Sequence, residues 1–176
     1  VRFISSDSGP SSVTNEAGDF ILYFTDSELD TFDFNGDGII GADEGTLIVS
    51  GGMDMDTNAS FLGELRADAG AEIVSPLTTV LTYMVSQGIR REVAEDRLIE
   101  AFDLDSSVNL RAFDPYAEID NNNSNASAVL LANLKLANAI NIPESILLAE
   151  GGDTFQSGDL SRALFSQIAQ EIGDGS

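Results

Sequence analysis

Up to about Val74, the apolar residues of the chain occur in short runs separated by Gly, Asn, Asp and Ser, a pattern typical of β-strands joined by turns. Several of these runs lack a clean alternation of apolar and polar residues, so the pattern leaves their pairing open. We therefore predict an all-β lobe over residues 1–74. Its strands are expected at Val1–Ser5, Asp19–Phe24, Thr46–Ser50, Phe61–Arg66 and Ala71–Val74.

From Ser75 onward, the apolar residues recur at helical spacing. Ser75 is a favourable N-cap, Pro76 suits the first helical position because its missing N–H costs nothing there, and Gly88 is placed to end the helix. We predict a helical lobe over residues 75–176, and hence an α+β fold without the strand–helix alternation of a parallel sheet. Further helices are expected at Arg90–Phe102, Asn125–Asn141, Pro143–Ala149 and from the capping residue Asp159 to about Ile172.

The predicted helix over Asn125–Asn141 carries apolar residues on nearly every side. A helix that is hydrophobic all round is normally buried in the centre of a domain. We therefore expect it to be the central and most buried helix, preceded by a polar loop over Asp120–Asn125. Its apolar positions are Val129, Leu130, Leu134, Leu136, Ala137 and Ile140.

The charge balance narrows the possible chemistry. The chain has 30 acidic and 8 basic residues, a net charge of −22, and neither Cys nor His. Thiol nucleophiles, thiolate or imidazole zinc sites and His-based triads are thus excluded, which leaves hard cations with oxygen ligands. An acidic surface of this kind repels phosphate, so we expect no nucleic-acid partner and no anionic-membrane binding. No apolar run approaches the roughly 20 residues of a membrane-spanning helix, so we also expect no membrane insertion.

One acidic segment, Asp33–Glu44, has the spacing of a metal-binding loop. Its first, third and fifth residues are Asp33, Asn35 and Asp37, and its twelfth is Glu44. Glycine at the sixth position allows a sharp turn, and an apolar residue follows at the eighth, so the segment matches the EF-hand calcium loop. The expected Ca²⁺ ligands are the side chains of Asp33, Asn35, Asp37 and Glu44 and the backbone carbonyl of Ile39.

A turn in which Asp and Asn side chains cap their own backbone is the alternative explanation of this loop. Asp54, Asp56 and Asn58 repeat the alternate spacing, but the next acid, Glu64, misses the closing position by one residue, so a second ion there is less favoured. The acidic turn of Asp103, Asp105 and Asn109, and the pair Asp114-Pro115, are explained by helix capping.

The segments on either side of the loop differ from those of a complete EF-hand. Thr25-Asp26-Ser27-Glu28 is a capping box that predicts a short helix towards Phe32. Downstream, Thr46-Leu47-Ile48-Val49 is apolar and β-branched, which predicts a strand instead of an exiting helix. A helix pair that opens on binding is therefore not expected, and the ion is predicted to stabilise the fold instead of switching it.

The chain contains the three short segments Leu47-Ile48-Val49-Ser50-Gly51-Gly52-Met53-Asp54, Phe61-Leu62-Gly63-Glu64-Leu65 and Ser75-Pro76-Leu77-Thr78-Thr79. With them the chain resembles a module of very large calcium-dependent adhesins and haemolysin-type proteins of marine bacteria and cyanobacteria. The resemblance extends over roughly Asp19 to Asn141 and implies a β-sandwich-like N-terminal lobe of the transthyretin type, in which a Gly18-Asp19-Phe20 turn precedes a core strand. It also implies calcium ligation by the acidic loop. The nonapeptide repeats of calcium β-rolls are absent, so no β-roll is expected.

From these observations we expect a non-catalytic, extracellular or cell-surface calcium-binding module of a larger adhesin-like protein, with a cell-surface or matrix component as a possible partner. Two other classes stay open. A polysaccharide hydrolase would use an Asp/Glu pair in a cleft. A dockerin-like protein-binding module would normally use two tandem loops, whereas one convincing loop is present here.

Overall fold

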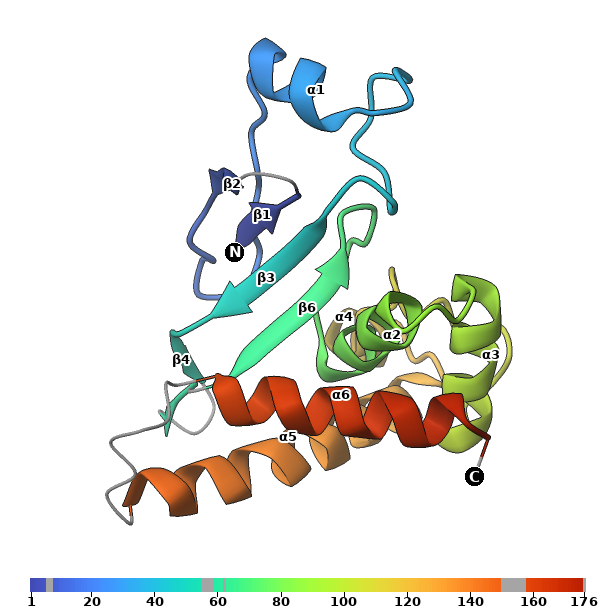
Figure 1. Cartoon of the computed structure of the whole chain (residues 1–176). Helices are drawn as coiled ribbons and strands as arrows, with labels where there is room; N and C mark the ends of the chain where they lie inside the picture. Colours follow the sequence, from blue (N-terminus) through green and yellow to red (C-terminus); the bar gives the residue numbers. More distant parts are fainter. Residues whose placement is uncertain (6–7, 55–58, 62, 150–157, 176) are drawn as a thin grey trace.

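The computed structural model describes residues 1–5, 8–54, 59–61, 63–149 and 158–175 of the chain. The described residues form a small antiparallel sheet followed mostly by helices, as Figure 1 shows, so the predicted α+β class is confirmed. The strands are β1 (Arg2–Ile4), β2 (Ser8–Ser11), β3 (Thr46–Ser50), β4 (Met53–Asp54), β5 (Ala59–Ser60) and β6 (Glu64–Asp68). The helices are α1 (Asp26–Phe32), α2 (Pro76–Ser86), α3 (Arg91–Ala101), α4 (Pro115–Asp120), α5 (Ala126–Ala149) and α6 (Asp159–Gly173).

Strand β3 is an inner strand of the four-stranded sheet, whose order is β2-β1-β3-β6. It pairs antiparallel with β1, placing Leu47 opposite Phe3, and with β6, placing Ile48 opposite Arg66. Its predicted bounds, Thr46–Ser50, are those observed. The described part of the lobe contains this one sheet and a separate β4-β5 pair, in place of the two facing sheets that the resemblance implied.

Two predicted strands do not form. Residues Asp19–Phe24 and Ala71–Val74 have no strand hydrogen bonding, and β2 occurs where no strand was predicted. The first segment still alternates, because Phe20, Leu22 and Phe24 pack on the core of the sheet whereas Ile21 and Tyr23 are exposed. The apolar run thus predicted a partly buried segment correctly, but its pairing with a neighbouring strand was predicted wrongly.

Three phenylalanines form the centre of the N-terminal core. The ring centroid of Phe3 lies 5.0 Å from those of Phe24 and Phe32, with edge-to-face geometry in both pairs. Backbone passes close to Phe3, because a Cβ added to Gly45 would lie 2.2 Å from its Cε2 atom and one added to Gly9 would lie 2.5 Å from its Cδ1 atom. Glycine is therefore required at both positions.

Three buried hydroxyls close the outer edge of β6. The backbone N–H of Arg66 donates to Thr79 Oγ1 at 2.8 Å, and Thr78 Oγ1 donates to the Arg66 carbonyl at 3.1 Å. The N–H of Glu64 donates to Ser161 Oγ of α6 at 3.2 Å. Helices α2 and α6 thus satisfy backbone groups that an edge strand would otherwise leave without partners. The predicted cap Ser75 is observed, in a reciprocal capping box with Thr78.

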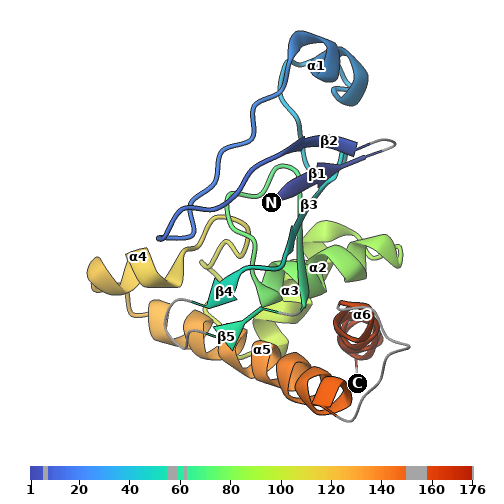
Figure 2. The ribbon, with the colours of Figure 1, turned by 90° about the vertical axis from the view of Figure 1, so that its left-hand side faces the viewer.

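Helix α2 is the central helix of the C-terminal core. It buries Leu77, Val80, Leu81 and Met84, and it packs against β6, α3, α5 and α6. The prediction that the helix beginning near Asn125 is the most buried one is wrong, because α5 lies at the margin of the molecule with one side exposed (Figure 2).

Helix boundaries differ from prediction in the last part of the chain. Pro143 lies inside α5, which continues to Ala149, instead of opening a separate helix. The N-cap of α6 is Gly158, in the left-handed region with φ 91°, and Asp159 is the first helical residue. The predicted capping role of Asp114 is confirmed, because its side chain accepts hydrogen bonds from the N–H groups of Tyr116 and Ala117 at the start of α4. Among the described helices, none is both long and apolar enough to cross a bilayer.

Candidate functional site: the acidic loop and its ion-pair network

The acidic loop begins directly at the end of α1. The predicted capping box is present, since the Thr25 side chain accepts from the N–H of Glu28 and the Glu28 carboxylate accepts from the N–H of Thr25. This backbone hydrogen bond holds the pKa of Glu28 below its ordinary value. The C-cap of α1 is Asp33, the first loop residue. Two residues after Glu44 the chain enters β3, so the observed unit is helix, loop and strand, as predicted.

Asp33 organises the first half of the loop. Its Oδ1 accepts hydrogen bonds from the N–H groups of Gly36 at 2.7 Å and Asp37 at 3.2 Å, and its Oδ2 accepts from Gly38 at 2.7 Å. Both glycines have positive φ, 72° and 82°, which L side chains rarely adopt. The glycines allow the loop to curl around one carboxylate.

The next two predicted ligands repeat this arrangement. Asn35 Oδ1 accepts from the N–H of Asp37 at 2.8 Å, and Asp37 Oδ1 accepts from the N–H of Ile39 at 2.9 Å. Each side chain thus folds back onto the backbone two residues ahead. The self-capping turn proposed as an alternative to ion binding is therefore present in the hydrogen bonds of the loop.

Glu44 joins the two ends of the loop. Its Oε1 accepts from the N–H of Asn35 at 3.2 Å, and its Oε2 accepts from the N–H of Gly41 at 2.6 Å. The residue is 4% exposed, so a carboxylate is buried at the twelfth position of the loop. Ile40 packs on the N-terminal core, whereas the Ile39 side chain is exposed. Because an isoleucine side chain has no polar atom, Ile39 could bind an ion only through its backbone carbonyl.

The loop supplies oxygen donors of the kind that calcium prefers, but they do not converge. Within the described residues, no three Asp or Glu side chains are grouped closely enough to hold a metal ion. Each carboxylate and carbonyl oxygen has two lone pairs, so accepting one N–H leaves capacity for a cation. The chemistry of the predicted ligands Asp33, Asn35, Asp37 and Glu44 therefore fits a hard cation, and binding would require these side chains to move closer together.

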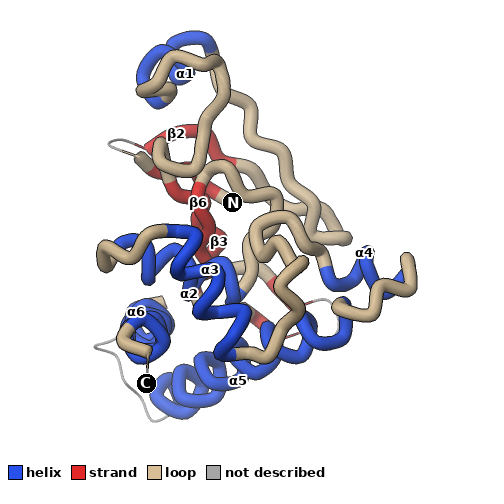
Figure 3. Tube along the Cα trace, turned by 90° about the vertical axis from the view of Figure 1, so that its right-hand side faces the viewer, coloured by secondary structure: helices blue, strands red, loops and turns tan. Residues whose placement is uncertain are grey.

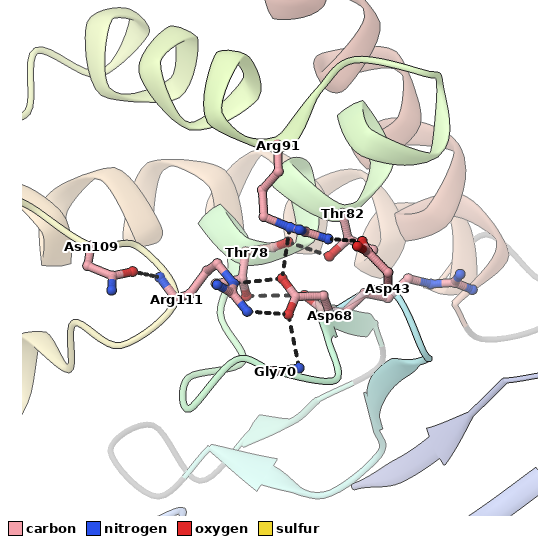
Figure 4. A network of polar contacts seen from close by, with 9 residues as sticks. Asp43, Asp68, Gly70, Thr78, Thr82, Arg91, Asn109 and Arg111 are labelled. Carbon is pink, nitrogen blue, oxygen red and sulfur yellow. Dashed lines mark hydrogen bonds and ion pairs between the residues drawn. The ribbon is translucent and has the colours of Figure 1, made fainter. Parts of the chain in front are cut away.

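An ion-pair network ties the end of the loop to the helical region (Figure 4). Asp43 Oδ1 lies 2.7 Å from Arg91 Nη2, at the first residue of α3. Arg91 Nε lies 3.6 Å from Asp68 Oδ2, at the end of β6. Asp68 also binds Arg111 through two hydrogen bonds, with Nε donating at 2.8 Å and Nη2 at 2.6 Å. The four charged residues of the network thus come from four segments that are distant in sequence.

One side of this network borders the partly buried carboxylate of Glu95, and another side borders a pocket. Burial raises the pKa of Glu95 on α3, with Arg111 and Arg91 opposing this effect and Asp68 and Glu92 adding to it. A pocket of about 380 Å³ opens beside the network, lined by Asp43, Glu44, Asp68 and Arg91 together with residues of β1 and α2. Sequence reasoning missed the network, although seven of only eight basic residues being arginine was a sign of specific ion pairing.

The weaker metal candidates have other roles or lie outside the described residues. Asp56 and Asn58 belong to the latter group, as does the Asp54 side chain. Glu64 is buried and paired with Arg66 at 2.6 Å. Asp105 Oδ1 accepts from the N–H and Oγ of Ser107, and these hydrogen bonds lower its pKa.

No protein-family model, curated protein or solved structure matches this chain. The interpretation of the site therefore rests on its own chemistry.

Proposed function

We propose that the chain binds one Ca²⁺ ion in the Asp33–Glu44 loop, and that the ion stabilises the fold. The observation that supports this most is the buried Glu44 carboxylate, which bridges the N–H groups of Asn35 and Gly41 across the loop. A buried carboxylate is costly unless it is compensated, and a divalent cation compensates more charge than two N–H groups do. The proposed ligands are the side chains of Asp33, Asn35, Asp37 and Glu44 and the carbonyl of Ile39.

The net charge of the chain supports the same proposal. At −22, mutual repulsion opposes the compact state, and one bound Ca²⁺ removes two units of that charge where acids are dense. Most of the loop oxygens accept a single N–H, so they would keep that hydrogen bond and bind the ion through the second lone pair. Asp33 Oδ1, which accepts two N–H groups, would have to release one of them, whereas Asp33 Oδ2 accepts only one.

The connections of the loop favour a structural ion over a switch. The loop leads into the inner strand β3, and Asp43 is paired with Arg91 of α3. Both attachments would have to break for the loop to swing as a unit. We therefore propose a non-catalytic calcium-stabilised module, in keeping with an extracellular or cell-surface setting, where calcium sites of about 10⁻⁴–10⁻³ M affinity are filled. Its place in a larger adhesin-like protein is part of this proposal.

Calcium-dependent melting tests the proposal. Adding calcium to about 100 times its Kd should stabilise the fold by about 2.7 kcal/mol, and chelation should reverse the effect. Isothermal titration should give one equivalent per chain. Glu44→Gln and Asp33→Asn should each weaken binding strongly, because each removes a charged ligand.

Asp43→Asn is the matched control, since Asp43 is the neighbouring acid but faces Arg91 instead of the loop interior. It should retain binding. An unchanged melting temperature at millimolar calcium, or equal calcium responses in all three variants, would refute the proposed site.

A further inference from the structure

The outer side of α5 is an exposed apolar stripe. Along this helix Val129, Leu136 and Ile140 are 2–4% exposed and join the C-terminal core. On the other side, four large apolar residues are about half exposed: Leu131 (52%), Leu134 (48%), Ile142 (58%) and Ile146 (53%). The sequence therefore encodes a helix apolar all round, and the described part of the chain buries only one of its two sides.

The exposed residues share one face. Their spacings are three, eight and four residues, and Asn138 occupies the intermediate position, so all five lie within a sector of about 120° around the helix axis. At 1.5 Å per residue the stripe from Leu131 to Ile146 is about 22 Å long. Figure 3 shows α5 at the margin of the molecule, with α2, α3 and α6 on its inner side. Four large apolar residues exposed on one face of a helix at the surface indicate an interaction surface, even with Asn138 between them.

The charge distribution indicates the partner. Between Ala126 and Pro143 the only charged residue is Lys135, in a chain that carries 30 acids. A cationic partner would be recognised through acidic residues flanking the stripe, and α5 has none over this stretch. By contrast, two chains of net charge −22 can approach each other closely only through a surface without acids.

We propose that the outer face of α5 binds the same face of a second copy of this chain. A two-fold axis near Asn138 would place Leu134 opposite Ile142 of the other copy, in antiparallel order, because Asn138 lies midway between these two residues. The long Lys135 side chain would extend to the polar margin of such an interface. The inference is independent of calcium binding.

Sedimentation velocity of the full chain tests this proposal. The wild type should form a dimer, and added salt should strengthen it, because salt screens the repulsion between two acidic copies. Leu134→Glu and Ile142→Glu should each weaken the dimer more than about tenfold, because each buries an unpaired charge. Circular dichroism and thermal melting should show that both variants remain folded, since both positions are half exposed.

Ile21→Glu is the matched control, because Ile21 is 62% exposed but lies in the N-terminal segment. It should leave the dimer unchanged. A wild type that stays monomeric at about 100 µM in high salt, or a dimer unaffected by both α5 variants, would overturn the proposal.

A cysteine experiment gives a second, independent readout, because the chain has no native Cys. Asn138→Cys should form a disulfide-linked dimer on mild oxidation, since a residue near the two-fold axis meets its own copy. Ser86→Cys, which is exposed at the end of α2, should remain monomeric. Equal cross-linking of both variants, or none at position 138, would contradict the antiparallel arrangement.

Discussion

The carboxylate of Asp43 and the guanidinium of Arg91 meet at 2.7 Å, although the two residues are 48 positions apart in sequence. Asp43 is the eleventh residue of the acidic loop, and Arg91 opens α3. Asp68 lies behind Arg91 and binds Arg111 as well. This network of ion pairs connects the last turn of the loop to the helical region. We therefore expect calcium binding in the loop to stabilise the loop and the helices together.

The two acids of the ion-pair network, Asp43 and Asp68, should differ in their contribution to stability. Asp68 is 12% exposed and is held by two arginines, whereas the Asp43 side chain is 87% exposed. We expect Asp68→Asn to lower the free energy of unfolding by about 2–3 kcal/mol, because it leaves Arg111 without its bidentate partner. Asp43→Asn should lower it by less than about 1 kcal/mol. Urea denaturation measures both, and equal losses would contradict this account.

The buried hydroxyl of Thr79 should contribute more to the free energy of unfolding than the hydroxyl of Thr82 does. Thr79 accepts the Arg66 N–H at the edge of β6, and Thr79→Val leaves this buried donor without a partner. We expect a loss of about 1–3 kcal/mol in unfolding free energy. Thr82 donates only to a carbonyl of its own helix, so Thr82→Val should be nearly neutral. Chemical denaturation of both variants tests the difference, and equal effects would argue against the closed edge.

Glu95 should make stability depend on pH. Burial raises its pKa in the folded state, so the fold disfavours the charged form. Burying the ionised carboxylate therefore lowers the free energy of unfolding at neutral pH. This cost disappears at pH values below 4.5, the ordinary pKa of glutamate, because Glu95 is then neutral in both the folded and the unfolded state. Glu95→Gln should thus raise the melting temperature at pH 7 but not at pH values below 4.5.

Glu100→Gln, at an exposed position of the same helix and not among the charges that act on Glu95, is the control for this measurement and should show no comparable gain at pH 7. A stabilisation of Glu95→Gln that persists unchanged in acid would show that the gain does not come from the charge.

Pro143 should destabilise α5. A proline inside a helix lacks the N–H of one backbone hydrogen bond and crowds the preceding turn. We expect Pro143→Ala to increase the helical signal in circular dichroism and to raise the free energy of unfolding by up to about 3 kcal/mol. A lower stability would indicate that the chain needs the interruption that the sequence pattern suggested.

Local signals predicted the elements around the site well, because their chemistry acts between near neighbours. The capping residues Thr25 and Ser75 bond three positions ahead, and both helix starts are where the sequence placed them. Gly38, at the sixth position of the acidic loop, has the predicted positive φ. The Asp43–Arg91 pair could not be predicted in this way, because it depends on how the acidic loop and α3 are brought together.

Two errors share a physical cause. The apolar run in Asp19–Phe24 and the apolar residues all round α5 both indicate burial, but neither pattern specifies which part of the molecule covers the segment. The first segment is covered by side-chain packing without strand pairing, and the second is covered on one side only. Convergence of the metal ligands was likewise beyond the sequence, since spacing fixes the order of Asp33, Asp37 and Glu44 but not their rotamers.

The hydroxyl-closed edge of β6 also limits how copies of the chain can polymerise. An incoming strand would have to displace Thr78, Thr79 and Ser161 from the backbone groups of Arg66 and Glu64. At the opposite edge, β2 contains Pro10, which offers no N–H to a neighbour. The sheet is therefore protected at both edges against the addition of further strands, which is the step by which fibrils grow.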